Sequence, residues 1–144
     1  MARVELNLPD KFLYKTEIAV RASDLNYGNH LGHDRVLTLM QDARVAFYRS
    51  LGFKNELNFE GPIGQVIADV VIQYKSESFL GDKLIINISV VDFNKYGFDM
   101  YYLVENAQTA KEVARAKIGI VCFDYDSRRI ARIPDALKTK LTFP

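Results

Sequence analysis

Side chains that could do chemistry gather between positions 23 and 33. Both histidines of the chain, His30 and His33, lie there, with Asp24 and Asn26 close by. A carboxylate or an imidazole can take a proton from water, and an amide side chain can orient that water. Glycine, asparagine and aspartate also favour turns and helix caps, so a purely structural role is the competing interpretation of the same residues.

This stretch leads into the only long helix that the sequence predicts, from about Asp34 to Leu51. Apolar residues recur through it at spacings of three and four, namely Val36, Met40, Ala43, Phe47 and Leu51. Unpaired N–H groups and a partial positive charge at a helix N-terminus suit a carbonyl or a developing oxyanion. Gly32 would let a ligand approach the backbone closely. We therefore expect a site in which the first helical amides polarise a carbonyl while a carboxylate or a histidine handles water.

Two histidines three residues apart could also mimic a metal site. A structural zinc site takes four cysteine or histidine ligands, whereas this chain has no third histidine, and its single cysteine, Cys122, lies far from the pair. We therefore expect no metal. One cysteine cannot form an internal disulfide, so Cys122 is most simply a small core residue.

The rest of the chain alternates apolar and polar residues as β-strands do. A first strand is predicted before the site, over residues 12–21, and four more follow the long helix. These four cover residues 66–74, 84–91, 98–104 and 113–125, and Pro134 can open a short helix over Asp135–Lys140. Because no helix connects the four later strands, we expect an antiparallel sheet with the long helix lying across it.

Parts of the predicted strands are apolar on both faces. The clearest examples are Val66, Ile67, Val70 and Val71. A second buried surface, most simply a subunit interface, would explain this surplus. Gln65 and Asp69 are expected to share one face of the same strand, where they could line a substrate pocket. A partly buried polar residue at an interface would explain both equally well.

Length and composition indicate one domain that spans residues 1–144. The hydrophobic fraction is 49% and the charged fraction 26%, as in globular domains with a buried core. The 19 Lys and Arg nearly cancel the 18 Asp and Glu to a net charge of +1, which argues against a nucleic-acid partner. The first eight residues lack the apolar region expected of a secretory signal, and no apolar run approaches the ~20 residues that cross a bilayer. We therefore expect a soluble, cytoplasmic protein without a membrane span.

Three segments resemble the hotdog-fold acyl-CoA thioesterases of the 4-hydroxybenzoyl-CoA thioesterase type. The first is Val20–Leu31 with Asp42-Ala43-Arg44 in the following helix, which resembles the family's Arg, Asp-x-Asp and Gly-His-Val-Asn-Asn opening and its acidic-Ala-Arg helix. The second, Tyr74–Leu84, resembles the family's connection through a Gly-Asp turn. The third, Val113–Phe123, resembles its last strand. Together they cover the chain from about Lys11 to Pro134.

The resemblance implies an α+β hotdog fold, with a five-stranded antiparallel sheet wrapped around one long central helix. It also implies a homodimer, or a homotetramer built as a dimer of dimers, with substrate sites at the subunit interface. The implied reaction is hydrolysis of a thioester of coenzyme A, or of an acyl carrier protein, to a free acid and a thiol. No cofactor is implied, because coenzyme A is part of the substrate.

The chain departs from the family pattern at the residue that supplies the catalytic acid in one branch, which is Asn26 here. Asp24 remains at the first position of the pair, and His30 matches the family's histidine. In another branch the acid follows a histidine by nine residues, a spacing that His33 and Asp42 reproduce. The acid is then Asp24, Asp42 or missing. The resemblance gives Asn26 and His30 the role of orienting water, and the amides near Gly32 and His33 that of polarising the thioester.

Two other functions stay open. A chain that has lost the acid could be a non-catalytic protein that binds acyl thioesters. Hotdog hydratases, which act on enoyl-CoA, carry Asp-x-Asn-Pro-x-His, and the Asp24-x-Asn26 pair copies the start of that motif. However, His30 comes one residue too late for it, and position 27 is tyrosine rather than proline. Since proton transfer needs the aspartate and the histidine aimed together, this spacing argues against a hydratase.

Overall fold

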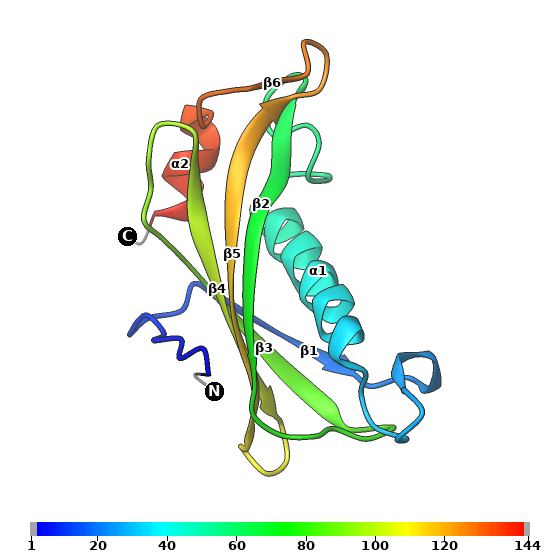
Figure 1. The fold of residues 1–144 in the computed structure, drawn as a ribbon. Coiled ribbons are helices and arrows are strands. Elements are labelled where there is room, and N and C mark those ends of the chain that lie inside the picture. The colour runs from blue at the N-terminus through cyan, green and yellow to red at the C-terminus, as the bar shows by residue number, and fades with distance from the viewer. Residues whose placement is uncertain (1–2, 143–144) are drawn as a thin grey trace.

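The structure, a computed structural model, describes residues 3–142, which form one antiparallel sheet and two α-helices (Figure 1). In chain order the elements are β1 (Tyr14–Ala19), a 3-10 turn η1 (Ala22–Asp24), α1 (His33–Ser50), β2 (Ile63–Tyr74), β3 (Lys83–Val91), β4 (Gly97–Asn106), β5 (Glu112–Asp124), β6 (Arg129–Ile130) and α2 (Asp135–Leu141). The predicted long helix, short helix and five strands are confirmed. The two-residue strand β6 was not predicted.

The sheet order explains why α1 must cross the sheet. The order is β1-β3-β4-β5-β2, each neighbouring pair is antiparallel, and β6 pairs with the end of β5. The two strands that flank α1 in the sequence therefore lie at opposite edges. Figure 1 shows α1 lying across one face between them, as the pattern of one apolar helix stripe and one sheet face predicts.

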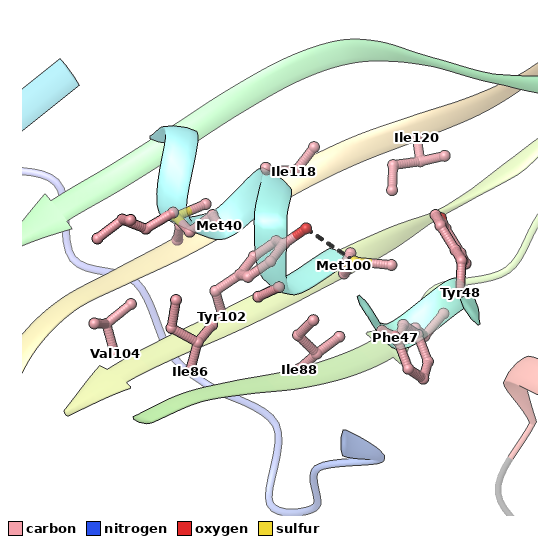
Figure 2. Packing of buried hydrophobic residues seen from close by; sticks show 14 of the residues in the cluster. Met40, Phe47, Tyr48, Ile86, Ile88, Met100, Tyr102, Val104, Ile118 and Ile120 are labelled. Carbon is pink, nitrogen blue, oxygen red and sulfur yellow. Dashed lines mark hydrogen bonds between the residues drawn. The ribbon is translucent and has the colours of Figure 1, made fainter. Parts of the chain in front are cut away.

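The core lies between α1 and the central strands (Figure 2). The helix contributes Leu39, Met40, Ala43 and Phe47, and the strands contribute Ile86, Ile88, Met100, Ile118 and Ile120, all of them buried. The opposite side of α1, which carries Asp34, Gln41 and Asp42, is exposed. The sheet therefore covers one side of the helix, whereas the family resemblance implied a sheet wrapped around it. Between residues 3 and 142, neither helix combines the length and the hydropathy that crossing a bilayer requires.

The N-terminal segment covers part of the sheet face that is turned away from α1. The backbone of Leu6 donates to Gln73 Oε1 at 3.2 Å and accepts from Arg115 Nη1 at 2.9 Å. Further along the segment, the carbonyl of Lys11 accepts from the hydroxyl of Ser89 at 2.7 Å. All three contacts are polar, so they attach the segment to the outer face without accounting for the apolar surplus of β2. The predicted subunit interface stays a prediction.

A bulge in β2 separates two residues that were predicted to share a face. The register shifts between Ile67 and Asp69, so Gln65 lies opposite Cys122 while Asp69 lies opposite Gly119. One extra residue moves every later side chain to the other face of a strand. Gln65 therefore points to the helix side, and Asp69 to the outer face. The predicted common face is wrong.

Candidate active site

The stretch before α1 folds into a tight loop that Asn26 holds together. Leu25 and Leu31 form a bridge at its base, and the backbone N–H of Asn26 donates to the carbonyl of His30 at 2.9 Å. The side-chain Oδ1 of Asn26 accepts from the backbone N–H of Gly28 at 2.9 Å. The side-chain oxygen of Asn26 is thus occupied within the loop, and its side-chain NH2 group is left to donate to other partners.

The connection between β2 and β3 forms the second wall of the site. The N–H of Leu31 donates to the carbonyl of Ser78 at 2.8 Å, and the hydroxyl of Tyr74 donates to the carbonyl of His33 at 2.8 Å. In Figure 1 this connection lies at the same end of the molecule as the start of α1. Residues more than forty positions apart in the sequence therefore face each other.

A pocket of about 340 Å³ lies between the two walls. Its lining residues are Asn26, His30, Leu31, His33, Tyr74, Lys75, Ser76 and Glu77. The Nδ1 atom of His30 lies 3.2 Å from the carbonyl oxygen of Leu31. Because a carbonyl only accepts hydrogen bonds, Nδ1 carries the proton, and the other ring nitrogen is left to face the pocket. That atom, Nε2, lies 3.7 Å from Glu77 Oε1.

Free backbone amides at the start of α1 are found one residue later than predicted. The N–H of Gly32, the N-cap residue, already donates to the carbonyl of Asp24 at 2.9 Å. The N–H groups of His33 and Asp34 have no acceptor among residues 3–142. Such groups point out of the helix end and bind negative charge. His33 and Asp34, rather than Gly32 and His33, therefore supply the available donors.

The carboxylate of Asp24 is fully buried and occupied by Arg21. Its Oδ2 accepts from the backbone N–H of Arg21 at 2.9 Å and from Nε at 3.2 Å, while Oδ1 accepts from Nη2 at 3.1 Å. Burial by itself would raise the pKa of Asp24, but these hydrogen bonds and the guanidinium charge hold that pKa below its usual value. Together the two side chains close the 3-10 turn before the loop.

We expect Asp24→Asn to lower the free energy of unfolding by about 1 kcal/mol at neutral pH. The effect is modest because the Arg21 side chain is largely exposed, so water screens its ion pair with Asp24. Because the pKa of Asp24 is lowered in the folded state, its ionised carboxylate stabilises the fold fully at pH values above its unfolded-state pKa, which is about 4. This contribution is lost as the pH falls through the folded-state pKa. Urea unfolding at pH 7 and pH 3 measures both effects. If the Asp24→Asn variant keeps the wild-type pH dependence, this prediction is contradicted.

The structure brings three of the predicted site residues together and leaves the others outside the pocket wall. Asn26, His30 and His33 line the pocket. Asp42 is exposed on α1, roughly 13 Å along the axis from His33 at 1.5 Å per residue. The other predicted residues outside the wall are Gly32, at the N-cap, and Asp24, Gln65 and Asp69.

Gln65 and Asp69 each have partners that account for their positions. Gln65 is buried, and its Oε1 accepts from the hydroxyl of Tyr48 at 2.5 Å. Asp69 accepts from Lys117 Nζ at 2.7 Å and from the N–H of Gly119 at 3.1 Å on the outer face. The hydrogen bonds and the Lys117 charge keep the pKa of Asp69 below its usual value.

The residues that sequence reasoning missed come from the second wall, above all Tyr74 and Glu77. The stretch that holds them resembles the thioesterase connection between strands, but no residue type in it points to the loop before α1. The pairing of Leu31 with Ser78, which depends on the folded sheet, brings the two walls together. Within the described part of the chain, no three His, Cys, Asp or Glu side chains gather as a set of metal ligands.

Residues 20–141 match a family model described as the thioesterase-like superfamily. A search of curated proteins gave no match. Among solved structures, a 1,4-dihydroxy-2-naphthoyl-CoA thioesterase from Synechocystis is 20% identical, with a TM-score of 0.81 over 89% of this chain and 94% of that one. YbaW, a probable thioesterase from Escherichia coli, is 22% identical, with a TM-score of 0.70 over 88% and 95%. SAV2348 from Staphylococcus aureus, solved in complex with CoA, is 15% identical, with a TM-score of 0.81 over 96% and 94%. At these identities the likeness concerns the fold.

Proposed function

Since the chain belongs to the thioesterase-like superfamily, we propose that it hydrolyses a thioester of coenzyme A, or of an acyl carrier protein, to a free acid and a thiol. The observation that carries the proposal is the pocket in which Asn26 and His30 lie beside His33, the first residue of α1, whose backbone amide is free among residues 3–142. Hydrolysis needs donors where the carbonyl oxygen becomes negative and an acceptor for the proton of water. This pocket offers both.

In the proposed reaction each group acts where its chemistry fits. The amides of His33 and Asp34 bind the carbonyl oxygen of the thioester, and the side chains of Asn26 and His30 orient the attacking water. Asp24 and Asp42 stay candidates for the acid that activates this water, although neither lines the pocket. The CoA complex of the S. aureus protein supports coenzyme A as the carrier. No separate cofactor is part of the proposal.

We also propose that the chain works as a homodimer or as a dimer of dimers. The support lies in β2, an edge strand whose backbone beyond Gln65 pairs, among residues 3–142, only with β5. On its helix side, Ile67 and Val70 are each 41% exposed, which is unusual for apolar residues in the middle of a long strand. A second copy of the chain that pairs along this edge would cover both residues.

A second candidate function is acyl-thioester binding without turnover. Two observations favour it, namely that Asn26 stands where one branch of the family has its acid, and that Arg21 occupies both carboxylate oxygens of Asp24. Binding then needs only the pocket and the helix amides. The two functions differ in whether a free thiol appears.

The test is a panel of short, long and aromatic acyl-CoAs, with thiol release followed by a thiol-specific chromogenic reagent. We expect release above background for at least one substrate. Binding of the same compounds is measured by calorimetry in parallel. Tight binding without thiol release would contradict hydrolysis and favour the binding protein, whereas neither binding nor release would overturn both functions.

A further inference from the structure

Glu77 lines the same pocket as His30, with Oε1 3.7 Å from Nε2 of His30, and neither sequence reasoning nor the family pattern assigned it a role. We propose that Glu77 is the general base that takes the proton from the attacking water, an inference that rests on the proposed thioester hydrolysis. Glu77 comes from the β2–β3 connection, while His30 comes from the loop before α1. The site is therefore assembled from two distant parts of the chain.

The geometry between the two side chains fits a water molecule. With its proton on Nδ1, a neutral His30 presents only an acceptor at Nε2, and an ionised Glu77 presents only acceptors. The two acceptors are 3.7 Å apart, which is too far for a hydrogen bond between them. Water has two hydrogens and can donate one to each. His30 then orients the water, and Glu77 receives its proton.

The carboxylate oxygens of Glu77 are also free to accept the proton of the water. Its side chain is 64% exposed, makes no hydrogen bond to residues 3–142, and lies 3.7 Å from Nε2 of His30. Asp24, in contrast, is fully buried, and both of its oxygens accept hydrogen bonds from Arg21. A base must be able to accept a proton and to release it again, and the contacts of Glu77 permit both.

The proposed step balances as follows. Glu77 takes a proton from water as the water oxygen bonds to the thioester carbon, and the carbonyl electrons move to the oxygen held by the amides of His33 and Asp34. The carbonyl then re-forms and the carbon–sulfur bond breaks. The leaving thiolate takes the proton back from Glu77, which gives the free thiol. The carboxylic acid product loses its own proton to solvent, and Glu77 is ionised again.

The test compares Glu77→Gln with the wild-type chain on whichever acyl-CoA gives thiol release. We expect kcat to fall about 10²-fold with KM changed less than about twofold, since the amide keeps the shape but cannot take a proton. The matched control is Glu17→Gln, because Glu17 is a similarly exposed (54%) glutamate with a cation, Lys83, 3.9 Å away. This control should keep the wild-type kcat. Circular dichroism confirms that both variants are folded.

A double variant tests whether Glu77 and His30 act as one unit. If they hold the same water, His30→Ala and the His30→Ala, Glu77→Gln pair should lose kcat by similar factors rather than by the product of the two single losses. A Glu77→Gln chain with wild-type kcat would overturn the role of Glu77 while hydrolysis stands. Absence of thiol release from the wild-type chain would instead overturn the proposed function itself.

Discussion

Replacing His33 by proline is expected to lower kcat for thioester hydrolysis by about 10²–10³-fold, the usual cost of losing one oxyanion donor. Proline has no N–H, so the change removes one of the two free amides at the start of α1. The fold should tolerate it, because His33 is the first residue of α1, a position where proline is favoured. Gly32 before it has φ −67° and ψ 142°, the conformation that a residue preceding proline adopts.

His33→Ala is the matched control, since it removes the imidazole and keeps the amide. In both variants the carbonyl of residue 33 can still accept from Tyr74, so the second wall of the pocket stays attached to the helix. The ratio of the two kcat values measures the contribution of the amide alone. Equal kcat values in two folded variants would mean that this amide does not bind the developing oxyanion.

The elements that the sequence predicted well are those with a regular period. The apolar spacing of α1 continues over five turns, and Gly52, with a φ of 97°, ends the helix where glycine in this conformation is expected to do so. A two-residue strand such as β6 has no period to detect. The bulge in β2 was equally hidden, because Ile67-Ala68-Asp69 contains no glycine, and a single aspartate within a strand does not mark a register shift.

The candidate site was half predictable for a similar reason. The loop with Asn26, His30 and His33 is contiguous, so its polar residues could be recognised together. The role of Asp24 could not be read from its type, because a carboxylate three residues after an arginine fits a capping pair and a catalytic acid equally well. Glu77 lies on the far wall, and its distance from His30 depends on how the sheet folds back.

Replacing Arg44 by methionine is expected to lower the free energy of unfolding by about 3–5 kcal/mol, because it leaves the largely buried carboxylate of Glu56 without its cation. Arg44 on α1 is buried, and its Nε donates to Glu56 Oε1 at 2.6 Å. Its Nη1 donates to the hydroxyl of Tyr102 at 3.1 Å. Figure 2 shows that hydroxyl deep in the core, directed at Met100. Burial alone would lower the pKa of Arg44, but Tyr102 and Glu56 raise it above its usual value, so the guanidinium stays charged.

The cost of Arg44→Met should come from the charge left behind rather than from lost packing, since methionine replaces most of the aliphatic stem. The double variant Arg44→Met, Glu56→Met separates the two causes, because apolar side chains in place of both partners of a buried ion pair are often tolerated. Urea unfolding followed by far-ultraviolet circular dichroism measures both variants. We expect the second substitution to recover most of the lost stability. If the double variant is as unstable as Arg44→Met, the unpaired carboxylate is not the cause, and the loss must lie in the contacts of Arg44 with β4, which include its hydrogen bond to Tyr102.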